Sequence, residues 1–326
     1  MSNVHITDQV SQELLAAIQA AAEAMRAEME IALQTVEKNN GVEKTSITVG
    51  TGNIRPSINI DRELEMIRSG EASIQECADA IVSKIRSLNL QEGVAAMSPH
   101  VSDMMERPDK ARITLAVVSK SQNEKLLKET PHRDLAGDLA VIARYQVSDE
   151  GTTVIKNSLA QSFGMTSSEV IEAGMKNISH DNYQVRSMSS ILSEMMGIPE
   201  DALREMQGIE QDAKMFVVTN ENKLYGATGI FVDRDLRQQV AETIGEDFYI
   251  IPSSIHEVIC VPADQMGPEE AAEMIRSVNG TEVAPEEVLS DHPYLVDAQT
   301  LKICNPCSNI VEADFAAERM AMAAHM

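Results

Sequence analysis

The chain has no tryptophan, and its other aromatic residues are confined to the later part of the sequence. All five tyrosines and all five phenylalanines lie at or after Tyr145, so the earlier residues must build any core from aliphatic side chains and methionine. This asymmetry predicts two structural regions, with a boundary within 90–112, where Gly93, Pro99 and Pro108 interrupt the pattern. We expect three parts: an N-terminal helical and hairpin region over 1–100, a main region over 109–299 and an acidic tail over 300–326.

Basic residues are also few. Lysine and arginine number 27 against 51 aspartates and glutamates, and the net charge of -24 would repel nucleic-acid phosphates. We therefore expect no direct nucleic-acid partner. Residues 264–326 alone hold 12 acidic and 3 basic side chains. A solvated acidic face is the simpler interpretation, and a docking surface for a basic protein partner is the alternative.

Long apolar runs and a secretory signal are absent from the sequence. No stretch approaches the roughly 20 apolar residues that span a bilayer, and the N-terminus lacks a basic region followed by an apolar one. The four cysteines, Cys77, Cys260, Cys304 and Cys307, are too few and too unevenly placed for a secreted disulfide framework. These absences predict a cytoplasmic protein with no membrane partner.

In the first part of the chain, apolar residues recur at spacings of three and four from Val10 to Val36. This pattern predicts one long amphipathic helix over 8–37. Its apolar stripe must be covered by the same chain or by a second copy, so a homo-oligomer through this helix stays an alternative. Two short alternating runs, 45–49 and 57–60, then predict a hairpin, and Ser73 begins a second helix.

The second part of the chain mixes strand and helix patterns, with hairpins prominent. This mixture favours an α+β fold with a mixed sheet built of hairpins and packed helices over a purely parallel sheet. The predicted strands are 112–119, 139–147, 152–156, 215–219, 227–232, 248–251 and 255–261. The predicted helices are 123–129, 187–196 and 199–207, with two more that begin at Ser167 and Pro268.

Six segments of the chain carry a family resemblance in their order along the sequence. They are KNNGV (38–42), RPSINID (55–61), PHRDLAGDLAVIARY (131–145), MFVVTNENKLYGATGIF (215–231), IGEDFYIIPSSIHEVICVPAD (244–264) and VNGTEVAPEEVLSD (278–291). Together they resemble a bacterial family catalogued as domain of unknown function 5688, over about residues 8–297. The resemblance implies a bacterial source and no particular activity. It also implies that the chain from Thr300 is an addition, which we expect to be dispensable for folding.

Ser254, His256 and Glu257 form the first cluster that could carry chemistry. A hydroxyl, an imidazole and a carboxylate are the parts of a nucleophile, a base and an orienting group. If 255–261 is extended, Ser254 and His256 share one strand face while Glu257 points to the other and does not orient the imidazole. We favour a turn whose serine hydroxyls bond nearby backbone amides, and keep a hydrolase using Ser254 and His256 as the alternative.

His132 and Asp134 are the second candidate pair, because a histidine and an aspartate beside a proline at a helix-to-strand junction often lie at a cleft. Asp138 could join them. No partner nucleophile can be assigned from the sequence, so we favour a structural junction in which Asp134 caps the backbone or pairs with Arg133.

Cys304 and Cys307 have the spacing of a redox dithiol or of half a zinc site. Zinc would need two further ligands, but the sequence has no second close cysteine pair and its seven histidines are scattered. The Gly50–Gly52 segment lacks the Lys-Ser/Thr pair of a phosphate loop. We therefore predict no metal and no cofactor, and interpret the two cysteines as reduced thiols.

These observations lead to one functional expectation and one alternative. We expect a non-enzymatic bacterial protein of the cytoplasm that acts through contacts with an unknown protein partner, as an accessory or regulatory factor. The alternative is the hydrolase centred on Ser254 and His256. An activated serine would react with a fluorophosphonate probe and a structural serine would not, so this reaction separates the two classes.

Overall fold

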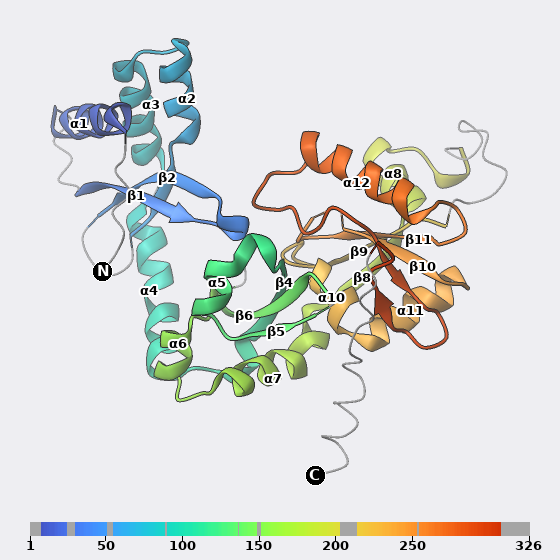
Figure 1. Ribbon diagram of the computed structural model, residues 1–326. Helices are drawn as coiled ribbons and strands as arrows, with labels where there is room; N and C mark the ends of the chain where they lie inside the picture. The colour runs from blue at the N-terminus through green and yellow to red at the C-terminus, as the bar shows by residue number, and fades with distance from the viewer. Residues whose placement is uncertain are drawn as a thin grey trace. The chain divides into compact units, whose positions relative to one another are not determined.

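The protein is described by a computed structural model that covers 8–24, 30–50, 55–88, 90–135, 137–148, 151–202, 214–252 and 254–307 (Figure 1). The chain divides into two compact units, 1–107 and 108–326. Three sequence-predicted features lie outside the described residues: the tip of the first hairpin at 51–53, most of the helix at 199–207, and the tail beyond 307.

The first unit is a three-stranded antiparallel sheet packed with helices. Its core is aliphatic, as the lack of early aromatics requires, and Leu14, Ile18 and Ile47 have no exposed surface. The strands, in spatial order, are β1 (Ile31–Glu37), β2 (Glu43–Val49) and β3 (Ser57–Asn59). The helices are α1 (Gln9–Ala24), α2 (Asp61–Ser69), α3 (Ile74–Ser87) and α4 (Leu90–Glu106).

The prediction of one helix over 8–37 is wrong in its second half. α1 ends at Ala24, and β1 pairs along its whole length with β2, from Ile31 opposite Val49 to Glu37 opposite Glu43. Backbone pairing with the next strand of the chain, in a hairpin, overrides the helical spacing of this short segment. The stripe on α1 packs against α3 within the same unit, so it no longer argues for a second copy.

The second unit contains two antiparallel sheets. In the smaller one, β6 pairs with each of the other three strands. These strands are β4 (Ile113–Ser119), β5 (His132–Asp134), β6 (Leu139–Ser148) and β7 (Gly151–Val154). The larger sheet has the order β13-β12-β10-β11-β9-β8. Its strands are β8 (Tyr183–Ser187), β9 (Phe216–Asn220), β10 (Phe248–Ile251), β11 (Val258–Pro262), β12 (Tyr294–Val296) and β13 (Ile303–Cys304).

Helices cover these sheets and connect them. They are α5 (Glu124–Glu129), α6 (Asn157–Ser162), α7 (Ser167–Asn177), α8 (Met188–Met196), α10 (Ala227–Val232), α11 (Arg234–Ile244) and α12 (Pro268–Thr281). In Figure 1, α12 and α11 lie on opposite sides of the larger sheet. Across the described ranges of both units, no helix combines the length and apolar composition that crossing a bilayer needs. The mixture of helices with hairpin-built sheets confirms the predicted α+β class.

The expected strand at 227–232 is instead the helix α10, and all six of its residues are buried. A short apolar run does not distinguish a buried strand from a buried helix. The sheet decides the outcome, because β9 already has β8 on one side and β11 on the other. α10 packs instead against β9 and β4, where the Thr228 hydroxyl accepts a hydrogen bond from the Val117 backbone N–H at 3.0 Å.

The segment after Thr300 forms the edge strand of the larger sheet, β13. β13 pairs with β12, and Leu301 is buried. The Arg237 side chain donates a 3.1 Å hydrogen bond to the Leu301 carbonyl. These contacts argue against dispensability of the first residues after Thr300, because they complete the edge of the sheet. The effect on folding of deleting the chain from Thr300 stays a prediction.

The β10–β11 hairpin supplies a test of the core. Ile250 has no exposed surface, whereas Ile259 on β11 is only partly buried. We expect Ile250→Ala to lower the free energy of unfolding by about 2–4 kcal/mol, through lost burial and a cavity. Ile259→Ala should cost less. Urea unfolding of both variants checks the order, and equal losses would show that the two strand faces are assigned incorrectly.

Candidate functional site

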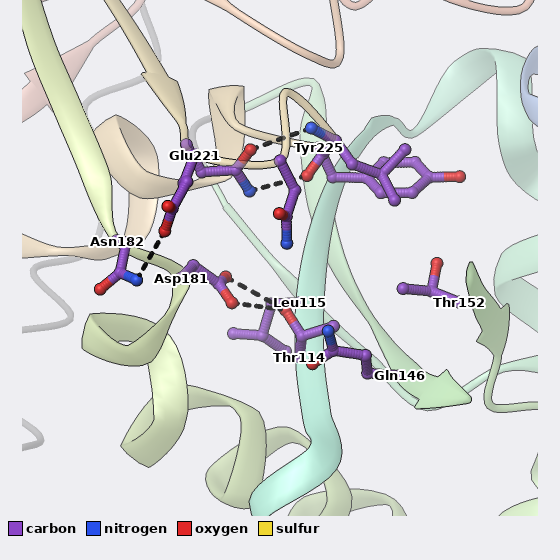
Figure 2. A pocket seen from close by; sticks show the side chains of 11 residues that line it. Thr114, Leu115, Gln146, Thr152, Asp181, Asn182, Glu221 and Tyr225 are labelled. Carbon is purple, nitrogen blue, oxygen red and sulfur yellow. Dashed lines mark hydrogen bonds between the residues drawn. The ribbon is translucent and has the colours of Figure 1, made fainter. Parts of the chain in front are cut away.

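A small polar pocket of about 90 Å³ opens in the second unit, between the smaller sheet and the loop that follows β9 (Figure 2). It is smaller than the cavities of about 300–1,000 Å³ that hold drug-sized ligands. Its lining comes from five parts of the chain: Thr114 and Leu115; Gln146; Thr152; Asp181 and Asn182; Asn220, Glu221, Asn222, Leu224 and Tyr225.

Asp181 is the most firmly held carboxylate of the pocket. Its Oδ2 accepts hydrogen bonds from the Thr114 hydroxyl and from the Tyr183 hydroxyl, both at 3.1 Å. Burial, together with the negative charge of Asp181, raises the pKa of Tyr183 well above its ordinary value. The tyrosine therefore stays a hydrogen-bond donor. Two hydroxyl donors fix the direction of the carboxylate, which faces Thr114 in Figure 2.

The loop after β9 forms one wall of the pocket and contains unusual backbone geometry. Lys223 and Tyr225 have positive φ angles of 50° and 57°, and Asn182 on the neighbouring loop has a φ of 49°. Asparagine tolerates this region more readily than lysine or tyrosine. A non-glycine residue held there costs on the order of 1–3 kcal/mol, so contacts elsewhere must stabilise the loop.

Three contacts supply this stabilisation. The Asn220 amide nitrogen donates to the Leu224 carbonyl at 2.8 Å, and its amide oxygen accepts the Leu224 N–H at 2.9 Å. The Tyr225 N–H donates to His256 Nδ1 at 3.1 Å. At Gly226, a Cβ would lie 2.6 Å from the backbone nitrogen of Asn220 and 2.6 Å from the backbone carbonyl oxygen of His256, so only glycine permits this close packing.

His256 therefore has a defined structural task. Since its Nδ1 accepts the Tyr225 N–H, the proton of the neutral ring is on Nε2, which lies 3.7 Å from a Glu287 carboxylate oxygen. Burial lowers the pKa of His256, although the nearby carboxylates oppose this shift. The Tyr225 and His256 rings are 5.5 Å apart between centroids.

Ser254 does not share a strand face with His256, because 254–257 forms a turn and β11 begins only at Val258. The Ser254 hydroxyl oxygen accepts hydrogen bonds from the backbone N–H groups of His256 and Glu257, at 3.0 and 3.3 Å. This is the geometry of a serine that holds a turn together. A catalytic role for Ser254 and His256 stays an untested alternative.

Arg144 lies on the other side of Tyr225. Its guanidinium carbon is 4.2 Å from the centroid of the tyrosine ring, a cation–π contact. Its Nε donates to the Thr152 hydroxyl at 2.7 Å and its Nη2 to the Thr152 carbonyl at 3.2 Å. Burial lowers the pKa of Arg144. The guanidinium thus orients both the tyrosine ring and a residue of the pocket wall.

Four of the segments quoted above for the family resemblance meet around Tyr225. They contribute Arg144, Tyr225 itself, His256 and Glu287. Of these four residues, the sequence analysis identified only His256 as a candidate site residue, and it paired this histidine with Ser254, two positions away. The order of the segments along the chain contains no signal that these four residues meet.

His132 and Asp134, the second candidate pair, are both exposed on the short strand β5. His132 Nδ1 lies 3.0 Å from the Thr130 carbonyl, and Asp134 forms a 3.2 Å ion pair with Lys120. These contacts fit a structural junction. A site role for the pair stays a prediction.

Asp138, which was expected near His132 and Asp134, instead contacts His292, far along the chain. Its carboxylate lies 2.9 Å from His292 Nε2 and accepts a 2.9 Å hydrogen bond from the hydroxyl of the fully buried Tyr294. Burial raises the pKa of Asp138, but the bonds from His292 and Tyr294 outweigh it and the net shift is downward. For His292, burial by itself lowers the pKa, but the hydrogen bonds to Asp138 and to the Pro293 carbonyl outweigh burial, and the net shift of the pKa is upward.

Cys304 and Cys307 lie at the edge of the larger sheet, and both are free thiols. Cys304 is half-buried and Cys307 is exposed. Partial burial raises the pKa of Cys307, whereas a reactive thiol needs a lowered one. Across the described residues, no group of three or more His, Cys, Asp or Glu side chains is arranged to hold a metal ion.

The Asp138–His292 pair predicts a pH dependence of stability. Because the pKa of His292 is raised in the folded protein, this residue stabilises the fold fully below the unfolded pKa of about 6.5, and the stabilisation is lost as the pH rises through the folded pKa. Because the pKa of Asp138 is lowered in the folded protein, this residue stabilises the fold above the unfolded pKa of about 3.9, and the stabilisation is lost as the pH falls through the folded pKa.

We therefore expect the urea midpoint to fall between about pH 6 and about pH 8, and His292→Gln to remove most of this fall. His100→Gln, at an exposed histidine on α4, serves as the matched control and should behave as the wild type. An unchanged pH dependence in His292→Gln would refute the assignment of this effect to His292.

Comparison with known proteins places the chain in one family. Residues 8–297 match a family of unknown function, DUF5688, and this range spans most of both units. No curated protein and no solved structure matches the chain. Because the match covers well over half of the sequence, the chain belongs to the family of unknown function DUF5688.

Proposed function

We propose that the protein acts through contacts with a basic protein partner, as a non-enzymatic accessory or regulatory factor in the bacterial cytoplasm. The observation that carries the proposal is the exposed face of α12. Met274 and Val278 are exposed to 43% and 41% and lie one turn apart. Exposed carboxylates of Glu270, Glu273 and Glu282 flank them.

The opposite face of α12 anchors the helix. Ala271 and Ile275 are buried against Tyr249, Ile251 and Val261 of the larger sheet. A helix anchored in this way presents its outer side chains in a fixed arrangement. Preorganisation of this kind reduces the entropy that binding costs.

The chemistry of the face defines the partner. Two adjacent apolar side chains flanked by carboxylates complement a partner helix with apolar residues flanked by lysine or arginine. Methionine is flexible and polarisable, which suits it to contact surfaces of this type.

A synthetic amphipathic peptide with leucines flanked by lysines tests this surface. In fluorescence anisotropy with the full chain, we expect saturable binding that weakens with added salt. Replacing both Met274 and Val278 by serine should weaken it by about tenfold or more, a change of about 1.4 kcal/mol. Met105→Ser alters an exposed methionine of the first unit and should leave the affinity unchanged. Equal affinity of the double variant and the wild type would exclude this face.

The hydrolase alternative has its own test. We expect no labelling of the native protein by a fluorophosphonate probe, because the Ser254 hydroxyl accepts two backbone N–H groups and the His256 Nδ1 accepts a third. Mass spectrometry of the treated protein detects any adduct. A modified Ser254 that disappears in His256→Ala would replace the contact proposal with the hydrolase.

A further inference from the structure

The charged side chains that line the pocket between the smaller sheet and the loop after β9 are acidic, and the Arg144 guanidinium contacts two of the uncharged lining residues, Thr152 and Tyr225. The charged members of the lining are the carboxylates of Asp181 and Glu221, and none of the described lining residues is Lys, Arg or His. The remaining polar members are amide and hydroxyl side chains: Thr114, Gln146, Thr152, Asn182, Asn220 and Asn222. A cavity whose two charged lining groups are both carboxylates favours a cationic guest that donates hydrogen bonds.

The acceptors of the pocket have fixed positions. Asp181 is oriented by the hydroxyls of Thr114 and Tyr183. Glu221 accepts a 3.0 Å hydrogen bond from the side-chain amide of Asn182, and its backbone N–H donates to the Asn182 carbonyl at 3.2 Å. Figure 2 shows these two carboxylates on the same side of the pocket, each held by a neighbour.

The size of the pocket limits the guest. At about 90 Å³ the pocket is well below the roughly 300–1,000 Å³ of cavities that hold drug-sized ligands, which leaves room for one small head group and not for a nucleotide. A divalent metal is less well matched, because no group of three His, Cys, Asp or Glu ligands occurs among the described residues. A planar guanidinium presents five N–H donors in a fixed fork and binds carboxylates bidentately.

We propose that this pocket binds a guanidinium group through Asp181 and Glu221. The group is carried either by an arginine side chain of a polypeptide or by a free small guanidine compound, which share the same recognition chemistry. The site contains none of the α12 residues of the proposed docking face. Its test is therefore independent of the test of that face.

Isothermal titration of the full chain with N-acetyl-arginine amide tests the proposal. We expect saturable binding, and no binding of the citrulline counterpart, in which a neutral urea replaces the guanidinium. Asp181→Asn should weaken the affinity by about tenfold or more, because the carboxylate becomes an amide that presents N–H groups to a donor. Glu242→Gln, at an exposed carboxylate on α11, is the matched control and should retain full affinity.

Since Asp181 also bonds Thr114 and Tyr183, circular dichroism must show that Asp181→Asn is folded. If it is not, Glu221→Gln, at an exposed residue, provides the same test. Agmatine and a capped Gly-Arg-Gly peptide distinguish the two sources, and saturable binding of either supports the site. Equal binding of the citrulline compound, or unchanged affinity in a folded Asp181→Asn or Glu221→Gln variant, would overturn the proposal. Binding of calcium in place of every guanidinium probe would also overturn it.

Discussion

The hydrogen bond from the Val117 N–H to the Thr228 hydroxyl is the contact on which the second unit depends. Among the described strands β4 pairs with β6 alone, so its outward backbone groups need partners from outside the sheet. Val117 and Thr228 have no exposed surface, and water cannot satisfy this N–H. α10 supplies the acceptor and packs against β9 at the same time, which joins the smaller sheet to the larger one. The pocket loop leads directly into α10, so the same helix fixes one wall of the candidate site.

Local signals in the sequence predicted the elements whose stability is local. Ser73 begins α3 as expected, through a capping box with Glu76. The strands predicted at 248–251 and 255–261 form the central β10–β11 hairpin, although β11 begins only at Val258. The errors occur where pairing or packing with another element decides the conformation. Residues 31–37 become a strand because β2 lies beside them, and 227–232 become a helix because β9 has no free edge. The apolar spacing of these two segments contains no information about those partners.

The candidate site shows the same limit. Ser254, His256 and Glu257 attracted interest because they are close in sequence, yet His256 bonds the backbone of Tyr225 and faces Glu287. Asp138, expected near His132, is held instead by His292, 154 positions away. No spacing rule joins residues across such distances. The family segments contain most of these residues, and only the fold shows which of them meet.

Native-state hydrogen exchange at the Val117 amide tests the central role of α10 most directly. With the Thr228 acceptor in place, the Val117 N–H should exchange only through global unfolding of the second unit, as slowly as the amides paired within the β10–β11 hairpin. In Thr228→Val, which keeps the side-chain shape and removes the acceptor, this amide should exchange much faster and the unit should lose about 1–3 kcal/mol of stability. Rapid exchange of Val117 in the wild type, or unchanged protection in Thr228→Val, would contradict this account of the fold.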